Sequence, residues 1–269
     1  MINLKRNNNL KQKIIVITGA SSGIGLMLAL DVAKKGAIPI LLARSTDKLK
    51  QAKADILRKT GMKADYFTVD VSDSESVAET FRQILERYKK VDVLINNAGY
   101  AIFDSFLNAK ADDIKGMFAV NVYGLIACTK AVLPGMIERN EGHIINIASQ
   151  AGKLATPKSS VYAATKHAVL AITNSTRMEL IDTNLVISAV NPGPIKTPFF
   201  DRADATGTYI KKVEKFMLEP GFVSAKIIQL IERPRREINL PRWMGLGTTF
   251  YQLFPGLFEK LAGKKLNQK

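Results

Sequence analysis

Apolar residues along this chain of 269 residues gather in short continuous runs, separated by longer stretches in which apolar positions recur with helical spacing. The runs are rich in Ile, Val and Leu, which is typical of strands buried on both faces of a parallel sheet. Seven strands are predicted, at 14–17, 37–43, 66–69, 91–95, 144–148, 186–190 and near 237–240.

Helical spacing fills the intervals between the predicted strands. The second helix has a cap at Thr46 or Asp47 and ends at Gly61. The other helices are expected at 24–33, from a capping signal at 72–75 to about 88, and at about 112–137, 159–181 and 222–233. Strands and helices alternate without a repeat and without a linker rich in Ser or Pro. This order predicts a single α/β domain with a doubly wound parallel sheet.

Composition divides the chain into three segments. Residues 1–12 are polar, carry only basic charges and lack the apolar core of a signal peptide, so we expect a flexible basic N-terminus. Residues 13–240 form the predicted domain, and residues 241–269 are an apolar and basic extension. Because no uninterrupted run of about 18 apolar residues occurs, we expect no membrane-spanning helix and a cytoplasmic protein.

The formal net charge of +15 favours a partner that carries phosphates. The basic residues are spread along the chain without a long block and without interleaved aromatic residues, which argues against nucleic acid as that partner. The single cysteine, Cys128, lies in an apolar stretch and is expected to be a buried thiol. With only His143 and His167 besides it, we predict no metal site.

Polar residues and glycines follow the predicted strands at their carboxyl ends, where doubly wound sheets bind ligands. They are Thr18 and Gly19, Arg44, Asp70, Asn97 to Gly99, Ser149, and Pro192 and Gly193. Their placement on one edge of the sheet predicts a binding site there.

The first of these loops, residues 18–25, runs directly into a helix. Glycine permits a sharp turn and the close approach of a phosphate, and the helix N-terminus offers free N–H groups. The loop therefore predicts phosphate binding, although a strand–helix turn without a ligand has the same pattern. The residues expected to take part are Thr18, Gly19, Ser21, Ser22, Gly23, Ile24 and Gly25.

Arg44 and Ser45 follow the second strand, about 20 residues beyond the glycine loop. A cofactor with a free ribose 2′-hydroxyl usually meets an acidic residue at that place, whereas a guanidinium can bind a 2′-phosphate through two hydrogen bonds. The nearest acidic residue, Asp47, is explained as a helix cap. We therefore expect NADP(H) as the cofactor, with a solvated arginine as the alternative.

Tyr162 and Lys166 are four residues apart early in a predicted helix and so lie on one face of it. A phenol is a poor acid or base at neutral pH, but a nearby ammonium favours the phenolate and lowers the pKa. Tyr162 could then exchange a proton with a carbonyl or alcohol oxygen that Ser149 also holds. A nucleophilic Ser149 with His167 as its base is the rival interpretation. Asn121, inside another predicted helix, is either a buried structural amide or holds a water on a proton path.

Together these motifs resemble the short-chain dehydrogenase/reductase family over about residues 13–240. The residues that carry the resemblance are Thr18-Gly19-x-x-x-Gly23-Ile24-Gly25, Asn96-Asn97-Ala98-Gly99, Asn121, Ser149, Tyr162-x-x-x-Lys166 and Pro192-Gly193. The resemblance implies a Rossmann-type fold, a small-molecule substrate, a homodimer or homotetramer, and reversible hydride transfer between NADP(H) and a carbonyl or secondary alcohol. The reductive direction is a hypothesis that rests on NADP(H) as the cofactor. Members that bind NADP often have a basic residue at the position of Ser22, so the expectation of NADP depends on Arg44.

The resemblance also implies roles for the site residues. Tyr162 is the expected catalytic acid/base, and Lys166 binds the nicotinamide ribose and lowers the tyrosine pKa. Ser149 positions the substrate carbonyl, and Asn121 supports a water relay to Lys166. The remaining cofactor contacts are implied at Asp70 and Val71 beside the adenine, at Asn97, Ala98 and Gly99 beside the adenosine ribose, and at Pro192, Gly193, Ile195 and Thr197 beside the nicotinamide.

Two segments of this chain lie at positions where members of the family differ from one another. Residues 198–221 correspond to the substrate lid, and their apolar composition suggests a lipophilic substrate, although an ordinary amphipathic helix would look similar. Residues 241–269 are apolar with a basic end at Lys264 and Lys265, and are interrupted by glycines and a proline, so they cannot span a bilayer. They form a subunit interface, a cover over the substrate cleft or an interfacial membrane anchor, in that order of expectation.

A cofactor-binding regulator or scaffold of the same fold, without turnover, is the alternative function. The presence of Ser149, Tyr162 and Lys166 together argues against it, because a protein without catalysis need not keep all three.

Overall fold

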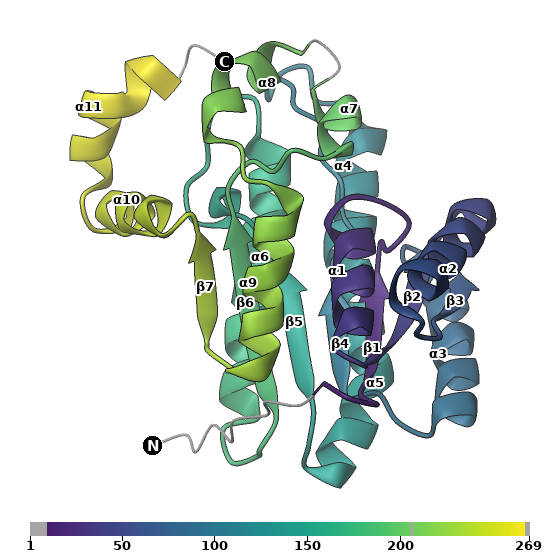
Figure 1. Ribbon diagram of the computed structural model, residues 1–269. Helices are drawn as coiled ribbons and strands as arrows, with labels where there is room; N and C mark the ends of the chain where they lie inside the picture. Colours follow the sequence, from purple (N-terminus) through teal and green to yellow (C-terminus); the bar gives the residue numbers. More distant parts are fainter. Residues whose placement is uncertain (1–9, 205–206, 267–269) are drawn as a thin grey trace.

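The computed structural model describes residues 10–204 and 207–266, which form a seven-stranded sheet with helices on both faces (Figure 1). Every pair of neighbouring strands is parallel, and their order is β3-β2-β1-β4-β5-β6-β7. The strands are β1 (Ile14–Thr18), β2 (Ile38–Ala43), β3 (Asp65–Thr68), β4 (Val93–Asn96), β5 (His143–Ile147), β6 (Val186–Pro192) and β7 (Glu237–Leu240). This is the doubly wound sheet of a single Rossmann-type domain, as predicted.

Helices cover the sheet in two layers, and β1 contributes side chains to both cores. Ile15 and Ile17 pack toward α1, α2 and α9, whereas Ile14 and Val16 pack toward α3 and α5. Successive side chains of a strand point to opposite faces, so a strand buried on both sides is apolar at every position. The helices of these layers are α1 (Gly23–Lys34), α2 (Thr46–Thr60) and α9 (Pro220–Glu232) on one face, and α3 (Ser74–Tyr88), α5 (Leu125–Arg139) and α6 (Ser160–Glu179) on the other.

Two helix predictions need correction. The cap of α2 is Ser45, whose Oγ accepts a hydrogen bond from the Lys48 N–H, and not Thr46 or Asp47. The predicted helix 112–137 consists of α4 (Ala111–Phe118), the π-helical turn η1 (Ala119–Gly124) and α5. The wider turn brings Asn121 into the interior, where its amide meets the backbone of Tyr100.

Among the described residues, the continuous helical stretch Ala111–Arg139 is long and apolar enough to cross a membrane by length and composition. Its α5 part packs in the core against the sheet, with Val132 and Met136 buried, which is the position of a core helix in a globular domain. Cys128 lies on the same buried face, and burial raises the pKa of its thiol to about 12, so the expected buried thiol is confirmed.

The ordered domain begins earlier than expected. Residues 1–9 of the predicted flexible N-terminus lie outside the described residues. Leu10, however, is buried in the core cluster of α1, and the Gln12 N–H donates to the carbonyl of Gly36. Residues 10–12 are therefore part of the domain, because an apolar side chain four residues before the start of β1 reaches the core.

Short elements complete the carboxyl edge of the sheet. The lid contains α7 (Phe199–Ala203), α8 (Thr208–Val213) and the 3₁₀ turn η3 (Glu214–Phe216), and another 3₁₀ turn, η2 (Gln150–Gly152), follows β5. The C-terminal extension forms α10 (Arg242–Leu253) and α11 (Pro255–Leu266), which project from the end of β7 (Figure 1). Gly245 and Gly247 do not interrupt α10; the break lies at Pro255.

Burial of His143, the first residue of β5, makes the fold sensitive to acid. Its Nε2 lies 2.9 Å from Oγ of Ser188, which itself donates to the Arg235 carbonyl, and burial lowers the pKa of His143 to about 3. The unfolded chain binds a proton below about pH 6.5 that the native chain does not, so stability falls as the pH drops from there toward 3.

We expect His143→Gln to remove this part of the acid sensitivity, which amounts to about 2 kcal/mol at pH 5. Urea unfolding of both proteins at pH 7 and pH 5 measures it. An equal loss of stability in the two proteins would contradict the assignment.

Candidate active site

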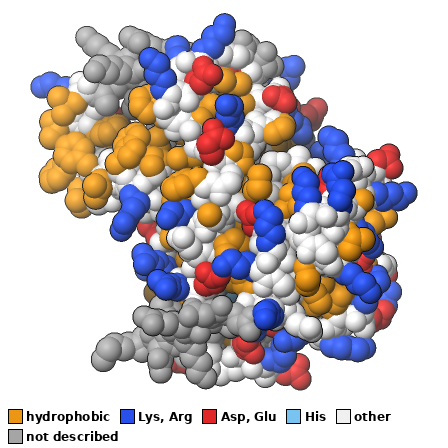
Figure 2. All heavy atoms as spheres, viewed as in Figure 1, with side chains coloured by type: hydrophobic (Ala, Val, Ile, Leu, Met, Phe, Trp, Pro, Cys, Tyr) orange, Lys and Arg blue, Asp and Glu red, His pale blue; other side chains and the backbone are white. Residues whose placement is uncertain are grey.

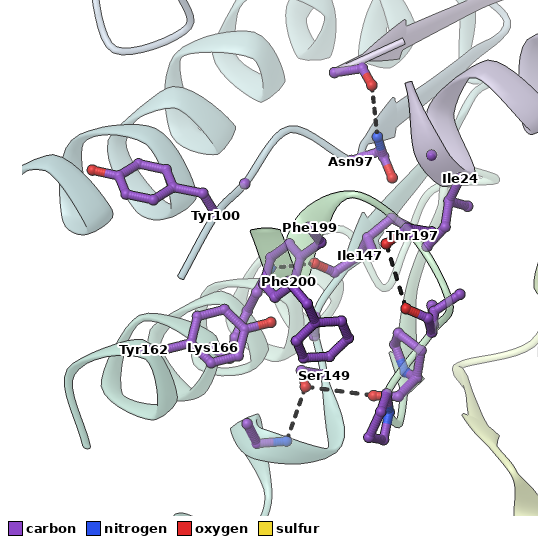
Figure 3. A pocket seen from close by; sticks show the side chains of 18 of the residues that line it. Ile24, Asn97, Tyr100, Ile147, Ser149, Tyr162, Lys166, Thr197, Phe199 and Phe200 are labelled. Carbon is purple, nitrogen blue, oxygen red and sulfur yellow. Dashed lines mark hydrogen bonds between the residues drawn. The ribbon is translucent and has the colours of Figure 1, made fainter. Parts of the chain in front are cut away.

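The loops after β1 and β4 meet at the point where the strand order reverses. Oγ1 of Thr18 accepts hydrogen bonds from the backbone N–H groups of Asn97 and Ala98, both at 2.9 Å. Nδ2 of Asn97 donates to the carbonyl of Thr18 at 2.9 Å and to that of Gly19 at 3.3 Å, and Figure 3 draws Asn97 with a dashed contact from this amide. Thr18 is buried, so its side chain ties the two loops together.

Glycines shape the turn between β1 and α1. Gly19 and Gly23 have φ of +66° and +54°, in the left-handed region that favours glycine. The first turn of α1 follows Ser22, whose side chain makes no capping hydrogen bond within the described chain. The N–H groups at this helix end are therefore available to an anion.

Gly25 packs closely against the backbone of the turn and against Asn97. A Cβ at Gly25 would collide with the Gly19 carbonyl oxygen and lie 2.7 Å from Nδ2 of Asn97. We expect Gly25→Ala to reduce the free energy of unfolding by about 1–3 kcal/mol, because the crowding falls on backbone atoms. Gly221→Ala is the control, since a Cβ there has no neighbour within 4 Å among the described residues. Chemical denaturation of both variants tests this, and equal stabilities would contradict it.

A cavity of about 960 Å³ extends along the carboxyl edge of the sheet, from the end of β2 to α6 and the lid. Most of the residues predicted for the site line it. They are Gly19, Ser21, Ser22, Gly23, Ile24, Arg44, Ser45, Asp70, Val71, Asn97, Ala98, Gly99, Ser149, Tyr162, Lys166, Pro192, Gly193, Ile195 and Thr197. Thr18, Gly25 and Asn121 are not in the lining and lie behind it.

One end of the cavity is basic. The exposed guanidinium of Arg44 has its Nη1 3.9 Å from Oδ2 of Asp70. Burial raises the pKa of Asp70, but hydrogen bonds from Ser72 and the Arg44 charge outweigh it, so this carboxyl has a lowered pKa. Lys48, in the first turn of α2, lines the same end and was missed in the sequence. Its position four residues after Arg44, just inside a helix, is the signal that could have found it.

The other end of the cavity brings Tyr162, Lys166 and Ser149 together from α6 and the end of β5 (Figure 3). Nζ of Lys166 donates to the Ile147 carbonyl at 2.8 Å and lies 5.8 Å from the centre of the Tyr162 ring. Oγ of Ser149 accepts from the Ala151 N–H at 3.0 Å and donates to the Pro192 carbonyl at 3.4 Å. The helical spacing of Tyr162 and Lys166 and the strand end at Ser149 thus place three polar groups around one space.

Burial changes the pKa of both ionisable groups. It raises the pKa of Tyr162 well above its usual value, and the interaction with the Ser149 hydroxyl offsets this only in part. It lowers the pKa of Lys166 to about 8. In the chain by itself the pKa of Tyr162 is thus raised, because burial disfavours the phenolate, and the lowering of this pKa by Lys166 stays a prediction.

Asn121 is fully engaged with the protein around it. Its Oδ1 accepts from the Tyr100 N–H at 2.9 Å, and its Nδ2 donates to the Tyr100 carbonyl at 2.9 Å and to Oγ1 of Thr165 at 3.1 Å. A Cβ on Gly99 would lie 3.0 Å from Asn121 Oδ1 and 3.6 Å from Lys166 Nζ. Of the two interpretations of Asn121, these contacts support the buried structural amide, placed next to Lys166.

Aromatic rings of the lid, together with Phe103 from the segment between β4 and α4, surround Tyr162. The centres of the Phe103 and Phe199 rings lie 6.0 Å and 5.9 Å from that of Tyr162, and Phe200 and Tyr209 extend the cluster. Figure 3 shows Phe199 and Phe200 beside the tyrosine hydroxyl. Such rings exclude water and offer an apolar surface to a ligand.

The arrangement does not support the interpretation of Ser149 as a nucleophile with His167 as its base. Nδ1 of His167 lies 2.8 Å from the carbonyl of Ala163 in its own helix, and His167 is not in the cavity lining. Ser149 makes its hydrogen bonds with Ala151 and Pro192. A serine without a base in reach is not activated for nucleophilic attack.

The C-terminal helices also contribute to the cavity, which the sequence left as one alternative of three. Trp243, Met244 and Thr248 of α10 line it, together with Phe258 of α11. Sδ of Met244 lies 2.8 Å from the place that a Cβ on Gly193 would take. α10 therefore covers part of the cleft.

Comparison with known proteins agrees with this geometry. The short chain dehydrogenase family matches residues 13–207. A dehydrogenase/reductase SDR family protein 7-like of Drosophila melanogaster is 36% identical over 242 residues, which cover 87% of this chain and 74% of that protein. An NADP-dependent 3-hydroxy acid dehydrogenase of Schizosaccharomyces pombe is 37% identical over 194 residues, or 71% of this chain and 75% of that protein.

Comparison with solved structures points to the same family as the sequence comparison. The structure of a short chain dehydrogenase/reductase from Burkholderia phymatum in complex with NAD superposes with a TM-score of 0.85 and 26% identity, covering 93% of this chain and 96% of that one. The sequence match and the structural match therefore point to one family. The chain also has a doubly wound sheet, a glycine turn after β1, and Tyr162, Lys166 and Ser149 around one space. The chain belongs to the short-chain dehydrogenase/reductase family, whose members are oxidoreductases that act on CH–OH groups.

Proposed function

We propose that this protein is an NADP(H)-dependent oxidoreductase that transfers a hydride between nicotinamide and a carbonyl or secondary alcohol, in the reductive direction. The observation that carries the proposal is a single cavity with Arg44 and Lys48 at one end and Tyr162, Lys166 and Ser149 at the other. An extended dinucleotide with an extra phosphate at its adenosine end would span the two groups.

The residues present fit such a cofactor. The turn with Gly19 and Gly23 leaves the backbone open to the pyrophosphate at the start of α1. Arg44 and Lys48 suit the 2′-phosphate, because both are cations and neither has a short ion pair among the described residues. Pro192, Gly193, Ile195 and Thr197 would hold the nicotinamide end near Tyr162. The bound nicotinamide would supply the hydride for reduction.

Tyr162 on α6 and Ser149, just after β5, would carry out the proton transfer. During reduction Tyr162 gives its phenolic proton to the carbonyl oxygen as the carbonyl carbon accepts the hydride, and the phenolate is reprotonated from solvent. Ser149 donates a hydrogen bond to the same oxygen and so fixes its position. Tyr162 is protonated at neutral pH, as a proton donor must be, although burial raises its pKa and so makes it a weaker acid. The reductive direction therefore rests on NADPH as the cofactor.

The aromatic rings around Tyr162 support a lipophilic substrate. Phe103, Phe199, Phe200 and Tyr209 form a continuous aromatic surface beside Tyr162. A carbonyl compound with an apolar body would bury that body against the rings while its oxygen meets Tyr162 and Ser149.

Oxidation of NADPH and NADH against a panel of ketones, aldehydes, quinones and 3-oxoacyl thioesters tests the proposal. We expect turnover with NADPH of at least one lipophilic member and slower turnover with NADH. NADPH binding by calorimetry without turnover of any panel member would instead favour a regulator or scaffold.

We also propose that the protein is a homodimer or homotetramer. Large apolar side chains are exposed on and next to the second helix layer, at Tyr123, Met178 and Ile181. Burial against a second copy would remove them from water. Sedimentation velocity measures the oligomeric state, and a monomer at micromolar concentration would refute this part.

A further inference from the structure

The outer face of the two C-terminal helices is apolar and exposed. We call this surface the α10–α11 patch. Its large side chains are 50–76% exposed, and Figure 2 shows them gathered on one side of the molecule. They are Trp243, Leu246, Leu253, Phe254, Leu257 and Leu261. So large a continuous apolar surface is unusual on a soluble domain and marks a contact with a partner or a membrane.

Arg242 and Lys260, both exposed, give this patch a basic border. Residues 241–269 contain Arg242, Lys260, Lys264, Lys265 and Lys269 against one acidic residue, Glu259. Among the basic side chains that the structure describes in this segment, those of Arg242 and Lys260 are exposed.

The lid extends this basic border. The Phe216 ring lies 6.3 Å from that of Trp243 and so brings η3 beside the patch. Lys215 in η3 and Lys211 and Lys212 in α8, just before it, are all exposed, and Glu214 is the acidic residue among them. An apolar surface with a basic rim is complementary to a bilayer that carries anionic lipid.

The dimensions suit a helix pair that lies in the membrane interface. Each helix has 12 residues and is therefore about 18 Å long, which is too short for the apolar core of a bilayer. Trp243 and Tyr251 are of the residue type that is enriched at the level of the lipid headgroups.

The patch adjoins the mouth of the cavity. Trp243 and Phe216 are more than half exposed and at the same time line the cavity, so the cavity reaches the surface between them. Met244 and Phe258 continue the lining inward. A molecule dissolved in a bilayer beneath the patch could enter along this apolar route without crossing water.

We infer that the α10–α11 patch docks on a bilayer containing anionic lipid and turns the mouth of the cavity toward it. A second copy of the chain is the less suitable occupant. A symmetric contact through this patch would bring two basic rims together, whereas anionic headgroups neutralise them. The docking does not depend on the reaction, so its test and the test of turnover fail independently.

The chain carries its own reporter, because Trp243 is its single tryptophan. The full chain is mixed with vesicles of phosphatidylcholine, with or without phosphatidylglycerol, and bound protein is measured by flotation. With phosphatidylglycerol present we expect flotation, a blue shift of the Trp243 emission and quenching by brominated acyl chains. High salt or neutral vesicles should weaken binding, because the basic rim contributes through charge.

Leu253→Glu tests the patch, since Leu253 is exposed on α10 and does not line the cavity. We expect about tenfold weaker vesicle binding, because burial of one leucine is worth a factor of that size. Leu57→Glu on α2 is the matched control, with a similarly exposed leucine far from the patch, and should bind like the wild type.

Two outcomes would overturn the inference. One is that the wild-type chain does not float with anionic vesicles, or that the Leu253→Glu variant floats as well as the wild type does. The other is self-association that Leu253→Glu abolishes in sedimentation, without any vesicle binding, which would assign the patch to a second copy.

Discussion

Replacing Tyr162 with phenylalanine is expected to reduce kcat for carbonyl reduction by about a thousandfold, while NADPH still binds. The change removes one oxygen atom and with it the proton donor, and general acid catalysis contributes about a hundredfold to ten thousandfold in enzymes. The ring would keep its contacts with Phe103 and Phe199, so the pocket retains its shape.

Stopped-flow NADPH oxidation measures the rate, and titration of NADPH fluorescence measures binding. Tyr66→Phe is the control, because Tyr66 lies on β3 at the far edge of the sheet and is not in the cavity lining. It should leave both quantities unchanged. A Tyr162→Phe variant with near-normal kcat would refute the assignment of the proton to this residue.

The second large effect is expected from Arg44→Asp. The ratio of kcat/KM for NADPH over that for NADH should fall by about a hundredfold or more. A hydrogen-bonded charge pair is worth about 1.5–3 kcal/mol, and the new carboxylate adds repulsion of the 2′-phosphate while it can accept from a free 2′-hydroxyl. Steady-state kinetics with both cofactors and one substrate from the panel give the ratio.

Lys50→Asp is the matched control for this experiment. Lys50 lies on α2 near Arg44, carries the same charge and is exposed, but it does not line the cavity. The substitution makes the same change in net charge, so a general electrostatic effect would appear in both variants. An unchanged preference for NADPH over NADH in the Arg44→Asp variant would refute the proposal that Arg44 binds the 2′-phosphate.

Much of the architecture could be read from the sequence because it depends on burial. A run such as Ile14 to Ile17 is apolar at every position, as a strand covered on both faces requires, and it is too short for a buried helix. The carboxyl-end residues Arg44, Asp70 and Ser149 then fall on one edge whatever the loops between them do. For the same reason most of the predicted site residues line one cavity.

What escaped prediction depends on contacts between distant residues. The pKa of Tyr162 reflects burial by Phe103 and Phe199, and nothing in the spacing of Tyr162 and Lys166 reports that packing. Lys48 appears in the sequence as an ordinary helix residue, and only the placement of α2 beside the cavity brings it to the site. The cap at Ser45 instead of Thr46 is a choice between adjacent polar residues that side-chain geometry decides.

The hydrogen bonds between Thr18 and Asn97 have a consequence for the kinetics of cofactor binding. They join the loops of β1 and β4 through contacts made within the chain, so this edge is preorganised before any ligand arrives. A preorganised receptor loses little conformational entropy on binding, and association is then limited by diffusion and by charge attraction toward Arg44 and Lys48. The association rate constant of NADPH should accordingly fall with ionic strength and show no slow second phase from loop ordering.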